Sequence, residues 1–146
     1  MARRRHSLLG IAGACLASDP STPIYAVEPH GCDAMTRSLE AGERVPVQPG
    51  PTIADGLKPV MVGALNFEIA KARGVTGYRV DDQEMGAAMI RLLMDAKILV
   101  EPSAAAGLAL ALRKELPGSP KRIGIMITGG NVDAARVTAL IDQHSS

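Results

Sequence analysis

Three polar positions in this sequence directly follow an apolar stretch, and their residue types could do chemistry. Glu28 follows Ile24–Val27, Glu101 follows Ile98–Val100, and Thr128 opens the run Thr128–Asn131 after an apolar segment. A carboxylate can hold a cationic ligand atom, and a hydroxyl can bond a polar ligand atom. Two glycines after the hydroxyl let a ligand come close to the backbone. We therefore take these three positions as the candidate site.

Each position also has a simpler explanation. Thr128–Asn131 fits a ligand-binding turn, in which amides of the following helix point at the ligand. It also fits an ordinary tight turn in which Asn131 caps the following helix. Glu101 precedes Pro102 and could simply favour the positive end of the next helix. Taken one at a time, the spacing favours these simpler explanations.

The elements that must position these residues alternate along the chain. The sequence predicts strands at Ile24–Pro29, Gly77–Val80, Ile98–Val100 and Arg122–Thr128. It predicts helices over Cys32–Ala41 (closed by Gly42), Val62–Arg73, the stretch after Asp81, Pro102 to Leu116–Gly118, and the residues after Asn131. This alternation indicates an α/β fold with a largely parallel sheet, in which ligands bind beyond the carboxyl ends of the strands.

Local signals support these elements. Asp81 and Glu84 have the spacing of a capping box, and Pro102 suits the first turn of a helix. Arg122–Thr128 is rich in branched residues and predicts a strand covered on both faces, whereas Val45–Pro59 predicts a structured loop. One buried helix face is predicted at Met85, Ala88, Met89, Leu92, Leu93 and Ala96.

Composition sets the outer limits. With 146 residues the chain is long enough for one domain with a core, and its 2% aromatic residues leave that core to aliphatic side chains. A formal charge of +1 without a large basic cluster argues against nucleic-acid binding. Cys15 and Cys32 have neither disulfide-scaffold nor zinc-site spacing, which favours a cytoplasmic protein.

The N-terminus has two interpretations. The stretch RRRHSLLGIAGACLAS has a basic head and a short apolar run, as in an export signal, and is too short to span a membrane. It also fits a small-residue helix over Ser7–Ala17. The resemblance described next favours the helix and leaves residues 1–7 as an atypical tail.

Five motifs occur in an order that resembles the C-terminal half of the serine/threonine dehydratase family, which includes the serine racemases. They are IYAVEPHGCDAM, TIADGL, DDQEMGAAMIRLL, KILVEPSAAAGLALAL and IGIMITGGNVD, and the similarity covers Leu8 to Asp133. The resemblance implies a pyridoxal-phosphate (PLP) enzyme of fold type II, which is tryptophan-synthase-β-like. Residues 8–146 would then be the C-terminal part of its large, partial doubly wound domain.

The resemblance also implies roles for individual residues. Thr128 matches the hydroxyl that bonds the pyridine nitrogen of PLP, with Gly129 beside it. Glu101 matches a carboxylate near the cofactor ring, for which the small-residue helix behind it leaves room. Gly56 matches a glycine whose backbone lines the site. These four residues form the implied cofactor-binding set.

A metal and a nucleotide are implied by the racemase-like members. Glu28 matches a ligand of a Mg or Ca ion and Cys32 a backbone-carbonyl ligand, but the third ligand, an Asp in those members, is Ala34 here, with Asp33 next to it. In the mammalian racemases, the positions that match Lys97 and Asn131 contact ATP.

Several parts of the family's site have no match here. The cofactor-binding lysine lies in a Ser-x-Lys-x-Arg segment, and the phosphate lies in a glycine loop, both in the N-terminal half of the family. We therefore expect a truncated or frame-shifted fragment of a serine/threonine ammonia-lyase, inactive alone and paired with the N-terminal half or with itself. The alternatives are a non-catalytic binding or regulatory module, a serine-racemase-like member, and an exported protein.

Overall fold

The computed structural model describes Asp19 and residues 21–144, so the predicted helix Ser7–Ala17, the tail 1–7 and Cys15 lie outside the described residues. The chain divides into two compact units. The first contains the described residues up to Pro51 together with Gly56–Arg79, and the second contains Thr52–Asp55 and the residues from Val80 onward.

The first unit is built on a small parallel sheet. Its backbone forms β1 (Tyr25–Pro29), α2 (Ala34–Ala41), α3 (Ala64–Ala72) and β2 (Thr76–Val80), and a short 3-10 turn, η1 (Asp55–Leu57), lies in the loop between α2 and α3. The amide of Thr76 at the start of β2 donates to the carbonyl of Ile24 just before β1, at 3.2 Å. Because the start of β2 pairs with the start of β1, the two strands run parallel, as predicted.

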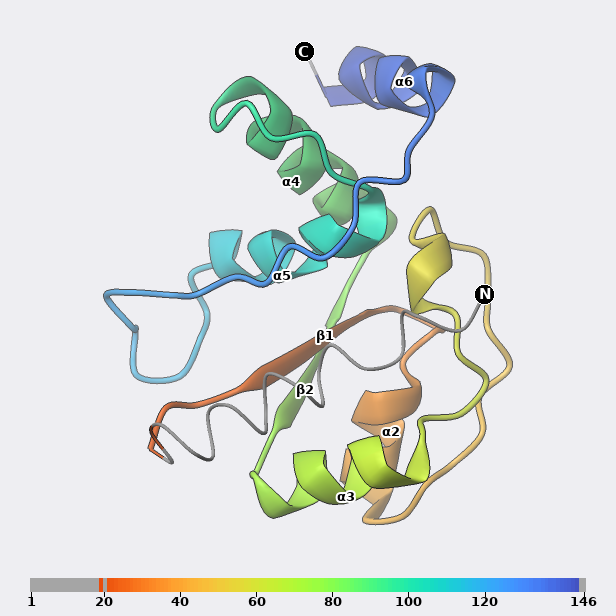
Figure 1. Ribbon diagram of the computed structural model, residues 1–146, viewed down its shortest axis with the longest axis vertical. Helices are drawn as coiled ribbons and strands as arrows, with labels where there is room; N and C mark the ends of the chain where they lie inside the picture. Colours follow the sequence, from red (N-terminus) through yellow and green to blue (C-terminus); the bar gives the residue numbers. More distant parts are fainter. Residues whose placement is uncertain (1–18, 20, 145–146) are drawn as a thin grey trace. The chain divides into compact units, whose positions relative to one another are not determined.

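Aliphatic side chains form the core of this unit, with one Phe among them. Helices α2 and α3 lie next to each other in Figure 1 and cover this core. Gly42 ends α2 in a left-handed conformation, with φ 75°, which confirms it as the closing residue. The buried core residues are Ile24, Ala26, Ala34, Met35, Val47, Val62, Phe67, Ala70 and Val75.

The second unit is helical. It contains α4 (Asp82–Met94), α5 (Pro102–Leu112) and α6 (Ala134–His144), and α4 packs against both α5 and α6 (Figure 1). The predicted capping box is confirmed, because the Glu84 amide donates to Asp81 and the Asp81 amide donates to the Glu84 carboxylate, each at 2.7 Å. Arg113 at the end of α5 pairs with Glu84, which ties the start of α4 to the end of α5.

Two predicted strands are absent from the described residues. Neither Ile98–Val100 nor Arg122–Thr128 is in a sheet, and β1 and β2 make the one sheet of the described chain. The segment Arg122–Thr128, here called the open segment, has no regular secondary structure, and Met126 is 60% exposed. A strand that is apolar on both faces needs neighbours on both edges, and the described residues supply none.

Smaller differences lie at helix ends. Helix α5 stops at Leu112 and does not reach Leu116. The predicted cap Asn131 is replaced by Asp133, whose carboxylate accepts from the Arg136 amide at 2.7 Å. Within the predicted face of α4, burial is confirmed for Met85, Ala88 and Met89, whereas Leu92 and Leu93 are half-buried and Ala96 is exposed. None of the described helices combines the length and the apolar character needed to cross a bilayer.

The exposed apolar side chains of the open segment lead to a prediction about self-association of the purified chain. We expect self-association or partial unfolding, because unpaired apolar strands attract one another. Met126→Glu should lower the self-associated fraction, measured by size-exclusion chromatography with light scattering. Leu65→Glu is the matched control, since Leu65 is 62% exposed on α3. A wild-type monomer with a sharp two-state melt would contradict this expectation.

Candidate functional site

Glu101 and Gly129 lie against each other in the second unit. The Glu101 amide donates to the Gly129 carbonyl at 3.0 Å, and the Glu101 side chain is buried, with 7% exposed. A Cβ atom on Gly129 would lie 2.7 Å from the Glu101 carboxyl carbon. The absence of a side chain at Gly129 therefore makes room for the carboxylate, which answers why a glycine stands there.

Thr128 precedes this contact directly in the chain and is exposed. On the other side, a Cβ on Gly130 would lie 3.2 Å from the Leu99 carbonyl oxygen, so the backbone of 129–130 runs close to that of 99–101. Three of the four residues predicted to bind the cofactor therefore lie together, where the residues after the open segment meet the start of α5. They are Glu101, Thr128 and Gly129.

One small residue of α5 makes room for a neighbouring segment of the chain. A Cβ on Gly107 would lie 3.0 Å from a methyl carbon of Ile125, and Ala104, Ala105 and Ala106 are buried. The absence of a side chain at Gly107 thus lets the open segment pack closely at Ile125. Room for a cofactor ring beside this helix stays a prediction.

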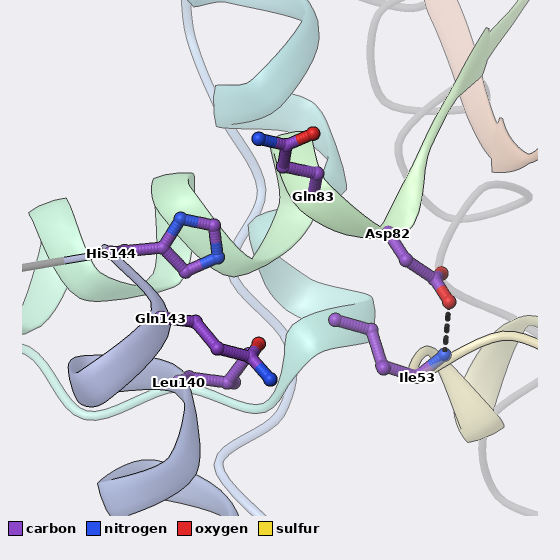
Figure 2. A pocket seen from close by; sticks show the side chains of 6 residues that line it. All are labelled: Ile53, Asp82, Gln83, Leu140, Gln143 and His144. Atoms are coloured by element: carbon purple, nitrogen blue, oxygen red, sulfur yellow. Dashed lines mark hydrogen bonds between the residues drawn. The ribbon is translucent and has the colours of Figure 1, made fainter.

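The fourth residue, Gly56, belongs to the first unit and is exposed in the 3-10 turn. The four residues before it, Thr52–Asp55, group with the second unit. They are held by Asp82, whose carboxylate accepts from the Ile53 amide at 3.0 Å and from the Thr52 hydroxyl (Figure 2). Sequence reasoning missed Asp82, because an acidic residue in a first helical turn looks like ordinary helix stabilisation.

A pocket of about 330 Å³ lies beside this loop. Figure 2 shows α6 side chains facing the first turn of α4 across it. No residue of the predicted site lines it, and its one carboxylate, Asp82, is already bonded to the loop. The lining residues are Ile53, Asp82, Gln83, Leu140, Gln143 and His144.

Glu28, the predicted metal ligand in the first unit, holds the start of α2. Its two carboxylate oxygens accept from the Met35 amide at 3.0 Å, the Thr36 amide at 2.8 Å and the Thr36 hydroxyl at 2.7 Å. Burial raises the pKa of Glu28, although these three bonds work against the rise. A Cβ on Gly77 of β2 would lie 2.7 Å from the Thr36 Cβ, so Gly77 makes room for Thr36.

Asp33, the residue beside the missing third ligand, is bonded to arginines. Its oxygens accept from Arg37 Nε at 2.9 Å and Arg79 Nε at 2.6 Å. Burial pushes the pKa of Asp33 up, but the bond from Arg79 and that from Arg37 outweigh burial and leave the pKa lowered. The two remaining Arg79 nitrogens bond both oxygens of Glu40, each at 2.8 Å, which lowers the pKa of Glu40.

These contacts do not fit a divalent cation. Both Glu28 oxygens accept protein hydrogen bonds, position 34 is an alanine, and the Asp33 carboxylate lies on two guanidinium groups. Cys32 is fully buried, with its thiol directed at the Gly50 carbonyl at 3.5 Å. Among Asp19 and residues 21–144, no group of three or more His, Cys, Asp or Glu side chains could hold a metal ion. These residues therefore do not fit the implied Mg or Ca ion.

The residues matched to nucleotide contacts lie in the second unit. Lys97 has a left-handed backbone, with φ 59°, and its Nζ donates to the Met94 carbonyl at the end of α4, at 2.8 Å. Asn131 is exposed. Lys97 thus already caps a helix, and ATP binding by this pair stays a prediction.

The residues present fit part of a PLP site. Thr128 is exposed, and the buried Glu101 carboxylate lies against Gly129. These are the residue types that the resemblance assigns to the surroundings of the cofactor ring. Among the described lysines, the amines of Lys71 and Lys97 donate to the main-chain carbonyls of Gly42 and Met94.

Substitution of Gly129 by Ala tests the contact with Glu101. We expect Gly129→Ala to lower the free energy of unfolding by about 1–3 kcal/mol, because the new methyl group collides with a buried carboxylate. Gly124→Ala is the control, since a Cβ there meets no atom within 4 Å. Urea unfolding followed by circular dichroism measures both, and equal losses would refute the contact.

The carboxylates around Arg79 predict a pH dependence. Because the pKa values of Asp33 and Glu40 are lowered in the folded chain, their stabilisation is complete above their unfolded pKa and is lost as pH falls. The stability gap between wild type and Arg79→Gln should thus be full at about pH 7 and shrink below about pH 4. Urea midpoints measure it, with Arg91→Gln, at an exposed pair with Asp95, as control.

Comparisons with known proteins support the family. A family described as "Pyridoxal-phosphate dependent enzyme" matches residues 6–129. A serine racemase of Dictyostelium discoideum is 36% identical over 90% of this chain and 43% of its own length. An L-threonine ammonia-lyase of Thermotoga maritima is 31% identical over 92% of this chain and 33% of its own length.

Solved structures share the fold. A fungal L-serine ammonia-lyase from Rhizomucor miehei aligns with a TM-score of 0.83 and 30% identity, over 96% of this chain and 47% of that one. A maize serine racemase aligns with a TM-score of 0.79 and 35% identity, over 93% of this chain and 43% of that one. The chain thus spans less than half the length of these relatives, and it matches a part of the fold type II architecture. By sequence and by fold, this chain belongs to the pyridoxal-phosphate-dependent enzyme family.

Proposed function

We propose that this chain is the C-terminal half of a PLP-dependent serine/threonine ammonia-lyase. Such an enzyme removes water from a β-hydroxy amino acid and then releases ammonia and a 2-keto acid. The observation that carries the proposal is the contact of Glu101 with Gly129, with the exposed hydroxyl of Thr128 directly beside it. The similarity to an L-threonine ammonia-lyase and to an L-serine ammonia-lyase supports the substrate class.

Each residue of this group has one task in the proposal. PLP supplies an electron-withdrawing ring that makes the α-proton of a bound amino acid acidic. Thr128 would bond the ring nitrogen through its hydroxyl, which would hold that nitrogen less firmly protonated than a carboxylate would. Gly129, without a side chain, would keep the Glu101 carboxylate in place, and Glu101 would lie near the ring.

The proposal includes inactivity of the chain by itself. Ammonia-lyase chemistry needs a lysine amine that binds the cofactor and moves a proton, and a backbone cradle for its phosphate. No lysine of this chain lies in a Ser-x-Lys-x-Arg segment. Both groups must then come from an N-terminal half of the same fold. A second copy of this chain is the other partner expected for its exposed apolar residues, but it would supply neither group.

The exposed apolar side chains support such a partner. Ile98, Leu99 and Met126, which are 44%, 51% and 60% exposed, lie in the two predicted strands that have no sheet here. The backbone of the open segment is available for pairing by strand addition. A cytoplasmic location belongs to the same proposal, and the buried thiol of Cys32, which is in no disulfide, is consistent with a reducing compartment.

A second candidate is a serine-racemase-like activity, favoured by the similarity to the racemases of Dictyostelium and maize. The same group of residues would serve it, since both reactions begin with loss of the α-proton. The substrates that are consumed and the products that form separate the two candidates.

Complementation tests the proposal. Co-expression of this chain with the N-terminal half of the Rhizomucor L-serine ammonia-lyase should give a complex that absorbs as bound PLP and forms keto acid from serine or threonine. Thr128→Ala should lower the rate by about 10-fold or more, and Thr128→Ser should retain it, because the ring bond needs only a hydroxyl.

Three controls accompany this measurement. The chain expressed alone should form no keto acid, and Gly124→Ala should behave as wild type because a Cβ there meets no atom within 4 Å. Chiral analysis of residual serine identifies racemisation. A stable complex that binds PLP yet forms neither keto acid nor D-serine would refute both candidates.

A further inference from the structure

The first unit carries a group of charges that the proposed catalytic function does not use. Asp33 precedes α2 and its side chain is 2% exposed, whereas Glu40 lies near the end of α2 and is 59% exposed. Both carboxylates are joined to one cation, Arg79 of β2. A buried carboxylate is costly unless a positive charge lies against it, so Asp33 needs a cation at this place.

Arg79 meets this requirement with all three of its guanidinium nitrogens. Nε donates to Asp33 at 2.6 Å, and the two terminal nitrogens donate to the two oxygens of Glu40, each at 2.8 Å. A planar guanidinium suits such paired bonds, which a round, strongly hydrated cation cannot copy. Arg79 belongs to β2, whereas Glu40 lies in α2 and Asp33 directly precedes it. The Arg79 side chain therefore also links α2 to the sheet.

We infer that Arg79, by bonding Asp33 and Glu40, keeps the divalent ion that the resemblance to racemase-like proteins implies away from the start of α2. The start of α2 is then held without Mg or Ca, and the chain neither binds these ions here nor gains stability from them. The inference is independent of the ammonia-lyase proposal, because it concerns the first unit alone.

The contacts of the neighbouring residues also disfavour a divalent ion here. Glu28 accepts three protein hydrogen bonds, from the Met35 and Thr36 amides and the Thr36 hydroxyl, so a cation would have to displace these donors. Position 34 is an alanine with no oxygen to offer. A cation near Asp33 would also meet two guanidinium groups, those of Arg37 and Arg79, whose charge repels it.

Terbium luminescence gives a direct test with the full chain. Tb³⁺ favours the same oxygen ligands as Ca²⁺, and it emits strongly when a nearby excited tyrosine transfers energy to it. The chain has two tyrosines and no tryptophan. Both belong to this unit, with Tyr25 in β1 and Tyr78 next to Arg79, and their rings are 5.5 Å apart. An ion bound at Glu28 or Asp33 would therefore be detected.

We expect no saturable tyrosine-sensitised emission from the wild type, and the same thermal midpoint in CaCl₂, MgCl₂ or EDTA. The double variant Ala34→Asp/Arg79→Gln frees Asp33 and Glu40 and adds a carboxylate. It should gain emission that Ca²⁺ displaces, with a midpoint raised by Ca²⁺. Circular dichroism confirms that this variant is folded.

Two results would overturn the inference. The first is wild-type emission that saturates, is displaced by Ca²⁺ and disappears in Glu28→Gln. The second is a folded double variant without emission, which would show that Arg79 is not what excludes the ion. Single variants supply the matched control. Arg79→Gln should lower the thermal midpoint by about 4 °C or more, and Arg37→Gln, whose side chain is 54% exposed, by clearly less.

Discussion

The hydrogen bond between the Glu101 amide and the Gly129 carbonyl is the contact on which the candidate site depends. It is a backbone contact between the end of one predicted strand and the end of another, and it brings the residues after the open segment to the start of α5. The buried carboxylate above it fits because Gly129 has no side chain. The contact holds Glu101 and Gly129 together, and Thr128 directly precedes Gly129 in the chain. The three residues therefore form one group in space.

The two units solve the problem of buried charge in different ways. In the first, Glu28 and Asp33 are satisfied by helix amides, a hydroxyl and guanidinium groups, so their charges serve the fold. In the second, the Glu101 carboxylate at the start of α5 lies against Gly129, whose lack of a side chain gives it room. The first unit thus accommodates its buried carboxylates with donors and cations, and the second accommodates Glu101 with a glycine.

Much of the fold follows from local signals in the sequence. The capping box of Asp81 and Glu84, the glycine that ends α2 and the proline that begins α5 act within a few residues, and each was predictable. The strands at Ile98–Val100 and Arg122–Thr128 were not, because a strand exists only when another pairs with it. For the same reason, the contact of Glu101 with Gly129 was not predicted, although the resemblance assigned both residues to the cofactor. The Asp82 contact with Thr52 and Ile53 was not predicted either. Arg79 carried no signal, since its partners lie 39 and 46 residues away in the chain.

Gly77 has a consequence for how this protein family can change. The space above Gly77 is filled by Thr36, whose hydroxyl in turn bonds Glu28, so three positions on three different elements share one small volume. A larger residue at position 77 forces out the threonine and removes a donor from a buried carboxylate, so these substitutions are not independent. Among related sequences, positions 28, 36 and 77 should therefore vary together or not at all, and homologues with a side chain at 77 should have lost both the threonine and the acid.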